Sequence, residues 1–259
     1  MVRLYLKYFA INIKSQMQYK TAFFLHLFGR IMLSFATVAG VWFMFLRFNR
    51  VEGFTLNQVL LCTAVTMMSY SITEVFARGF DIFPRLLGNG EFDRYLVRPR
   101  GVIYQVIATH MEFGRLGVFI QAVIVFCYAI PNSGIVWSPD KILTLFLMII
   151  CGAAVFSGLY IIFASFSFFT VEGLEFMNIL THGGKEFGRY PYAIYGEGIL
   201  KFLTFIIPLA LFQYYPLLYL IERESSPLYI LTPLLSMFFL VPCYVFWKIG
   251  LRHYKSTGS

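Results

Sequence analysis

This chain of 259 residues is 59% hydrophobic and only 13% charged, whereas a water-soluble domain is roughly half apolar and a quarter charged. Its mean hydropathy is +0.71. The formal net charge of +8 does not indicate a nucleic-acid-binding protein, because the basic residues are scattered along apolar runs instead of gathered on one soluble face. These features predict an integral membrane protein, and the length of the apolar runs favours helices over a barrel.

Six apolar runs approach the roughly 20 residues that a helix needs to cross a hydrocarbon core of about 30 Å. We therefore predict an all-α membrane protein in which residues 1–259 form one transmembrane domain. The predicted spans are residues 21–46, 56–77, 112–130, 142–169, 202–220 and 228–250. Proline residues are expected to bend or break the last two spans, at positions Pro208, Pro216, Pro233 and Pro242.

The Lys and Arg residues are distributed unevenly between the two sides of this arrangement. A small group falls on one side, namely Arg47, Arg50, Lys141 and Arg223, and most of the others fall on the opposite side. Because cytoplasmic flanks carry the excess of Lys and Arg, both termini are predicted to be cytoplasmic, in the inner (plasma) membrane. On this orientation the connector at residues 185–197 is expected to be a cytosolic loop.

Residues 1–20 mix apolar and basic side chains and are too polar to span the membrane. Leu6, Phe9 and Ile13 interleave with Lys7 and Lys14. This pattern favours an N-terminal helix that lies along the inner interface in contact with lipids. An extension of the first span with snorkelling basic side chains is the alternative.

Four ionisable residues within the predicted spans or at their edges are candidates for function, because charges at bilayer depth are costly unless they are paired or used. His26 and Arg30 lie four residues apart on one face of the first span. Glu74 and Arg78 have the same spacing at the end of the second span and can form an ion pair. For Arg30, the alternative to a functional role is pairing with a carboxylate or snorkelling, which would stabilise the helix bundle.

The connector between the second and third spans carries a distinctive mixture of residues. A short amphipathic helix at residues 82–87 is followed by the turn-forming sequence Gly88-Asn89-Gly90 and then by a charged segment that Pro99 ends. Charges of both signs on a rigid element favour recognition of a partner protein. The alternative is a solvated loop in which the arginines only follow the positive-inside rule.

At this point the chain resembles the six-helix ABC-2 type permeases of bacterial three-gene exporters. The resemblance rests on three segments, which read FARGFDIFPRLLGNGEFDRYLVRP, KEFGRYPYAIY and FIIPLALFQYYPLLYL, and with the spacing of the spans it covers essentially the whole chain. In that family the element after the second helix is a cytosolic coupling helix that docks on an ATP-binding subunit. The resemblance therefore implies docking by Phe83, Arg85, Leu87, Glu91, Asp93, Arg94 and Arg98. Phe92 stands where an aliphatic residue is usual in the family.

The chain has no nucleotide-binding or metal-binding motif of its own. The P-loop pattern G-x-x-x-x-G-K-[ST] does not occur, and the nearest fragment, Gly183-Gly184-Lys185, is followed by Glu186. The four cysteines lack metal-ligand spacing. We expect no cofactor in this chain. The resemblance implies that ATP and Mg²⁺ are bound by a partner P-loop ATPase and that a second permease, a copy or a sibling, completes the transporter.

The sequence therefore predicts the permease subunit of an ATP-driven exporter, without enzymatic activity of its own. An aromatic content of 19% suits a lipophilic or amphiphilic substrate. Two other classes stay open. A membrane-embedded enzyme would need convergent acid, base or metal-binding motifs, which are absent here. A secondary transporter would favour broken helices in both halves of the chain, whereas the prolines gather in the second half.

Overall fold

The computed structural model describes every residue except 1, 49, 171–174, 225 and 257–259, and this described part contains helices and no β-strand. The longer helices are α1 (Val2–Met17), α2 (Lys20–Arg47), α3 (Leu56–Asp81), α7 (Leu116–Asn132), α8 (Pro139–Phe166), α9 (Glu175–Phe187), α11 (Leu209–Leu220) and α13 (Leu240–His253). The shorter ones are α4 (Phe83–Gly88), α5 (Asp93–Leu96), α6 (Val102–Thr109), α10 (Glu197–Phe205) and α12 (Leu228–Ser236). Short 3₁₀ helices lie at Phe113–Arg115, Tyr192–Tyr195 and Met237–Phe239. The prediction of an all-α protein is confirmed.

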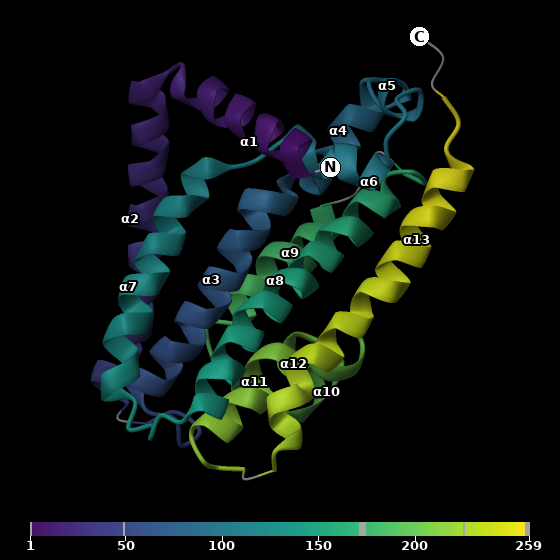
Figure 1. The fold of residues 1–259 in the computed structure, drawn as a ribbon. Coiled ribbons are helices and arrows are strands. Elements are labelled where there is room, and N and C mark those ends of the chain that lie inside the picture. Colours follow the sequence, from purple (N-terminus) through teal and green to yellow (C-terminus); the bar gives the residue numbers. More distant parts are fainter. Residues whose placement is uncertain (1, 49, 171–174, 225, 257–259) are drawn as a thin grey trace.

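Five helical stretches in the described residues are long and apolar enough to cross a membrane, and the bent pair α10–α11 raises the number to six if it counts as one span. The five run over Lys20–Arg47, Leu56–Gly88, Phe113–Asn132, Pro139–Phe166 and Leu228–His253. Both ends of the chain lie at the same end of the molecule as α4 and α5 (Figure 1). This is the arrangement that an even number of crossings produces.

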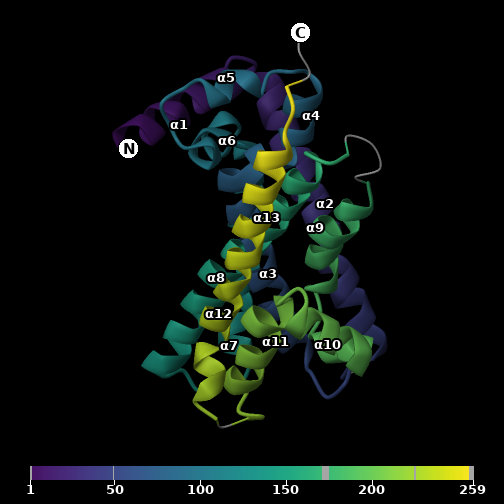
Figure 2. The same cartoon turned by 90° about the vertical axis from the view of Figure 1, so that its right-hand side faces the viewer.

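Helix α3 is the centre of the bundle, and α2 is its most exposed long helix. Within the most apolar stretch of each helix, 89% of the residues of α3 are buried against 6% of those of α2. Side chains along α2 such as Leu25 and Leu33 are more than two-thirds exposed, and Figure 2 shows α2 and α9 on the same side of the molecule. The outer face of α2 can therefore be covered only by lipid or by another protein.

Local sequence explains how α3 begins and how closely it packs. A capping box starts the helix, in which the backbone N–H of Thr55 donates to Gln58 over 3.1 Å. At its other end Gly79 lies against α6, where a Cβ atom would come within 1.9 Å of the Val106 carbonyl oxygen. Glycine is therefore required for this close approach.

The fifth predicted span, residues 202–220, is not one straight helix. The chain bends by 113° between α10 and α11. Pro208, which we expected to bend this segment, lies directly before α11. The sixth span is also interrupted, by a 3₁₀ turn at Met237–Phe239 between Pro233 and Pro242. Both breaks occur in the half of the chain that holds these prolines, because proline removes a helical hydrogen bond.

The expectation that residues 185–197 form a cytosolic loop was wrong. The hydroxyl groups of Thr63 and Thr66, in the middle of α3, donate to the carbonyls of Arg189 and Gly188 over 2.7 and 2.8 Å. The Gln213 side chain also donates to the Gly188 carbonyl, over 2.7 Å. Tyr192 is fully buried. Residues 188–192 of this segment therefore lie inside the helix bundle, whereas Gly196 and Glu197 are exposed, and α9 runs alongside α3 and α8 (Figure 2).

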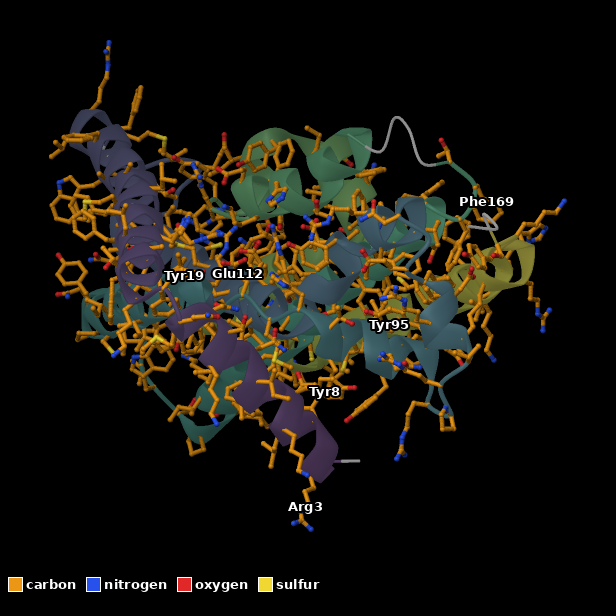
Figure 3. All side chains as sticks on the ribbon, turned by 90° about the horizontal axis from the view of Figure 1, so that it is seen from above. Arg3, Tyr8, Tyr19, Tyr95, Glu112 and Phe169 are labelled. Atoms are coloured by element: carbon orange, nitrogen blue, oxygen red, sulfur yellow. The ribbon has the colours of Figure 1, made fainter. Side chains whose placement is uncertain are left out.

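Helix α1 lies across the end of the bundle that carries the termini, and seen from above Arg3 points away from the molecule (Figure 3). Its Asn12 side chain donates to the Ala108 carbonyl over 3.4 Å, and the Gln16 side chain bonds the backbone of Met111 and Phe113. The predicted N-terminal helix is present and is attached to the segment that leads into α7.

Candidate functional site

The element formed by α4 and α5 is attached to the bundle by aromatic side chains. The rings of Phe83 and Trp247 lie 5.0 Å apart, and Phe92 lies 5.0 Å from Phe83. Phe83 and Phe92 are fully buried, and Leu87 is 5% exposed. Phe92 therefore fills the contact between α5 and the rest of the protein, and Phe83 and Leu87 face the bundle and not the surrounding medium.

The exposed surface of this element carries charged residues, two large apolar side chains, and the turn residues Gly88 and Asn89. Four of the seven residues that the resemblance implied for docking are exposed, namely Arg85, Glu91, Arg94 and Arg98. Leu96 is 44% exposed and Val97 is 84% exposed. The large apolar side chains that reach the surface are therefore Leu96 and Val97, which directly precede Arg98 and Pro99, whereas Phe83 and Leu87, which the resemblance implied for docking, are buried.

Asp93 is held by the C-terminal segment. Its carboxylate accepts hydrogen bonds from the hydroxyls of Tyr254 and Ser256 over 2.9 and 2.6 Å. The Tyr254 ring also packs against Phe92 at 5.0 Å. Burial and the bond to Asp93 raise the pKa of Tyr254 to about 12, so its hydroxyl keeps its proton at neutral pH. The end of α13 is thereby joined to α5.

The predicted pair of Glu74 and Arg78 is present and belongs to a larger ionic cluster. Glu74 is fully buried and accepts from Arg78 over 2.6 Å. Arg115, at the start of α7, forms a second ion pair with Glu74. Arg78 also lies 3.2 Å from Asp81, and the Tyr160 hydroxyl of α8 lies 3.4 Å from Glu74. The cluster joins α3, α7 and α8 near the end that carries α4 and α5.

His26 and Arg30 lie in different surroundings. Arg30 forms an ion pair with Glu112 over 3.3 Å, and Glu112 lies 3.7 Å from His110. His26 is exposed on α2. The structure therefore brings Arg30, Glu74 and Arg78 to one side of the bundle and leaves His26 outside. Their ion-pair partners Arg115 and Glu112 lie at the start of the predicted third span, residues 112–130, and were not among the candidate residues predicted from the sequence.

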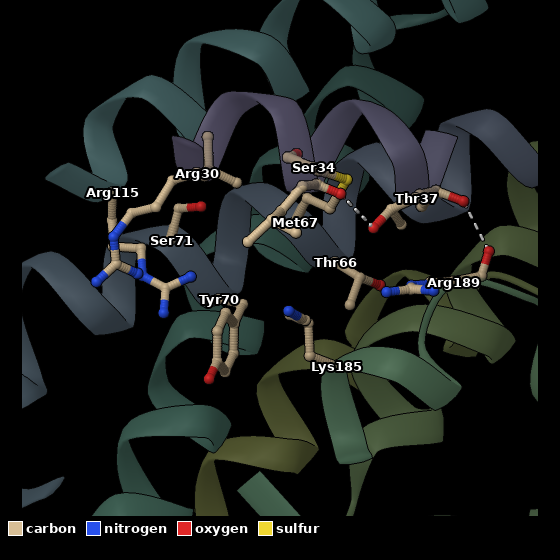
Figure 4. Close-up of a pocket in the computed structure, with 13 residues that line it drawn as sticks. Arg30, Ser34, Thr37, Thr66, Met67, Tyr70, Ser71, Arg115, Lys185 and Arg189 are labelled. Atoms are coloured by element: carbon tan, nitrogen blue, oxygen red, sulfur yellow. Dashed lines mark hydrogen bonds between the residues drawn. The ribbon is translucent and has the colours of Figure 1, made fainter. Parts of the chain in front are cut away.

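A cavity of about 130 Å³ lies between α2, α3, α7 and the end of α9 (Figure 4). Arg30 and Arg115 lie at one end of it, Arg189 lies at the other, and Lys185 lies between them. The Lys185 ammonium is 5.2 Å from the centre of the Tyr70 ring. The remaining lining is Leu33, Ser34, Thr37, Thr63, Thr66, Met67, Ser71 and Val118.

Comparison with known proteins identifies a family for this fold. A family model described as "ABC-2 family transporter protein" matches residues 31–258, which is most of the chain. Searches of curated proteins and of solved structures found no match. Among the described residues no group of three or more His, Cys, Asp or Glu side chains is placed to hold a metal ion.

Proposed function

The chain belongs to the ABC-2 transporter family, and from this membership we propose that it is the membrane permease of an ATP-driven exporter, docked on its ATPase through α4 and α5. The proposed cargo is lipophilic or amphiphilic and leaves the cytoplasm across the inner membrane. Both termini face the cytoplasm. A P-loop ATPase binds ATP and Mg²⁺, and a second permease completes the pathway.

The observation that carries this proposal is the composition and attachment of α4 and α5. The element exposes Arg85, Glu91, Arg94 and Arg98, while its aromatic side chains fix it to α13 and to the end of α8. Charges of both signs on a rigid support suit a specific partner. A force applied to this surface reaches the bundle directly, because Phe83 and Phe92 are fully buried.

The exposure of helix α2 favours the proposal of a second permease. Its apolar side chains, such as Phe28, Leu33 and Phe43, are more than half exposed. Six helical crossings form a thin pathway by themselves, and a two-fold arrangement of permeases would enclose a larger one.

The proposed docking surface can be tested by reversing two exposed charges, Arg85→Glu with Arg94→Glu. These side chains make no contact that holds the bundle together, so the variant should purify with an unchanged melting temperature. Docking of the co-expressed ATPase should weaken by roughly tenfold or more, and most strongly at low ionic strength, where exposed charges are screened least. The measurements are co-purification at several salt concentrations and ATP-driven transport in vesicles.

The matched control is Arg47→Glu with Arg50→Glu, two exposed arginines at the opposite end of the bundle. This variant should keep full docking and transport. Full docking and transport by the Arg85/Arg94 variant would show that the ATPase binds elsewhere. ATP hydrolysis by the purified permease alone would overturn the proposal itself.

A further inference from the structure

The cavity of Figure 4 gathers basic side chains from three separate segments of the chain. Arg30 comes from α2, Arg115 from the start of α7, and Lys185 and Arg189 from the end of α9 and the residues after it. Among the described residues that line the cavity, none is acidic. The wall therefore presents positive charge from three directions.

The cavity extends well into the bundle. Arg30 is ten residues from the start of α2 and Ser71 is ten residues from the end of α3, which at the rise of an α-helix is about 15 Å from the end that carries the termini. That is far enough to place Arg30 within a hydrocarbon core of about 30 Å. Ionisable groups at this depth are rare and generally serve a function.

Ion pairing does not account for all of this charge. Lys185 and Arg189 share the single carboxylate of Glu186, whose side chain is 43% exposed and does not line the cavity. Arg30 pairs with Glu112 and Arg115 with Glu74, which also pairs with Arg78 outside the cavity. Among the described residues, the four cations of the lining therefore pair with three carboxylates, all of which lie outside the lining, so an anion in the cavity would be attracted.

A buried hydroxyl group gives an independent indication of a ligand. Ser71 lines the cavity and is 1% exposed, yet its Oγ atom has no hydrogen-bond partner in the part of the chain that the structure describes. Its neighbours on α3 differ, since Ser69 donates to the Ile149 carbonyl over 3.0 Å and Thr73 to the Ala153 carbonyl over 2.8 Å. Buried polar groups are almost always satisfied, so the Ser71 hydroxyl is free to donate to a molecule in the cavity.

Apolar surface adjoins the charged wall. Leu33, Met67 and Val118 line the same cavity. On another face of α9, Gly184 and Phe187 line a second cavity of about 200 Å³ whose other walls, from α10, α11 and the bend between them, are also apolar. A molecule with an acidic group and an apolar part would match both kinds of surface.

We infer that the cavity between α2, α3, α7 and α9 binds the acidic headgroup of an amphiphile, a phosphate or carboxylate whose apolar part lies along α2. This inference rests on the proposed function and narrows its cargo from amphiphiles in general to acidic ones. A volume of about 130 Å³ has room for several water molecules, which suits a small anionic headgroup. The Ser71 hydroxyl and the Lys185 ammonium donate to it.

The test is lipid binding by the purified permease in neutral detergent, followed by native mass spectrometry. Phosphatidic acid supplies a headgroup with an apolar part, phosphatidylcholine supplies a zwitterionic one, and inorganic phosphate supplies the free anion. Phosphatidic acid should bind at least about tenfold more tightly than phosphatidylcholine, and millimolar inorganic phosphate should not displace it. Equal binding of the two lipids, or displacement by free phosphate, would overturn the inference.

Substitutions assign the binding to this cavity. Lys185→Gln should weaken binding of phosphatidic acid by roughly tenfold, the loss of one charge-assisted hydrogen bond, and Lys185→Arg should restore it. Lys201→Gln is the matched control, because Lys201 is exposed on α10 and pairs there with the likewise exposed Glu197 over 2.6 Å. This control should bind within about twofold of the unchanged protein. Equal losses in Lys185→Gln and Lys201→Gln would assign the lipid to the surface and overturn the site.

Ser71→Ala separates ligand binding from folding. Removing a hydroxyl that has no partner among the described residues should leave the melting temperature unchanged and weaken lipid binding severalfold. Unchanged binding would exclude Ser71 from the site. The ATPase plays no part in these measurements. If the permease binds the headgroup but no ATPase associates with it, the inferred site is supported and the proposed function is refuted. If an ATPase associates but the headgroup does not bind, only the inferred site is refuted.

Discussion

The fully buried carboxylate of Glu74 offers a direct test of how the bundle is held together. Its partners come from two helices, Arg78 on α3 and Arg115 at the start of α7. Glu74→Gln keeps the shape of the side chain and removes its charge. Arg78 then retains Asp81, 3.2 Å away, whereas Arg115 loses the one carboxylate with which it pairs in the described residues.

The expected loss is large because an unpaired charge is left in the interior. The side chains of Arg78 and Arg115 are only 18% and 16% exposed. Removing one partner of a buried pair typically costs about 3–5 kcal/mol. At roughly 2–4 °C for each kcal/mol in a chain of this size, we expect Glu74→Gln to lower the melting temperature of the detergent-solubilised permease by roughly 6–20 °C.

A double variant tests the reason for this loss. In Glu74→Gln with Arg115→Gln no unpaired guanidinium remains, so the double variant should be less destabilised than the sum of the two single variants, by about 1–3 kcal/mol. The matched control is Glu197→Gln, which breaks an exposed pair and should cost under about 1 kcal/mol. Additive losses in the double variant, or equal losses at Glu74 and Glu197, would refute the reasoning.

Three further predictions concern packing, topology and the C-terminal segment. Gly79→Ala should destabilise the fold by about 1–3 kcal/mol in thermal melting, since a Cβ would overlap the Val106 carbonyl, whereas Gly29→Ala, with nothing within 4 Å, should stabilise it slightly. In a variant without native cysteines, an impermeant thiol reagent should label Glu224→Cys on intact cells and Asn89→Cys only after lysis; the reverse pattern would invert the orientation. Tyr254→Phe should increase hydrogen exchange in the C-terminal segment, because a donor to Asp93 is lost, and unchanged exchange would show that the bond contributes little.

Hydropathy was enough to predict most of the membrane helices, because each needs only an apolar run of sufficient length. The fourth span was expected at residues 142–169 and is Pro139–Phe166. The sequence explains its earlier start, since Pro139 lies in the first turn of α8. Proline favours this position because the N–H group that it lacks would have no helical partner there.

The same reasoning failed for residues 185–197, and the physical cause is the pairing of their polar groups. Lys185 and Arg189 raise the polarity of the segment to that of a loop. In the structure both side chains form ion pairs with Glu186. The backbone carbonyls of Arg189 and Gly188 accept hydrogen bonds from Thr63 and Thr66. Hydropathy treats each residue alone, so it cannot detect partners more than 100 residues away in the sequence.

The residues implied for docking fall into a buried group and an exposed group for a related reason. The family resemblance made Phe83 and Leu87 candidates for contact with a partner, but the bundle already supplies Trp247 and Phe168 as neighbours of Phe83. Which face of a six-residue helix is buried depends on where α13 lies, and helix spacing in the sequence does not contain that information. The charges of Arg85 and Arg94 placed them outside correctly, because burying them unpaired would be unfavourable.

Helix α3 joins the three features of this protein in one continuous element. Thr63, Thr66 and Ser71 line the cavity, Glu74 and Arg78 follow within the next two turns, and α4 begins two residues after α3 ends. A displacement of α4 therefore acts on α3 through the ionic cluster before it reaches the cavity. A helix is stiff along its axis, whereas ion pairs can exchange partners. A movement at α4 would therefore change the position of α7 relative to α3 at the pairs of Glu74 with Arg78 and Arg115. The shape of the cavity would change with it.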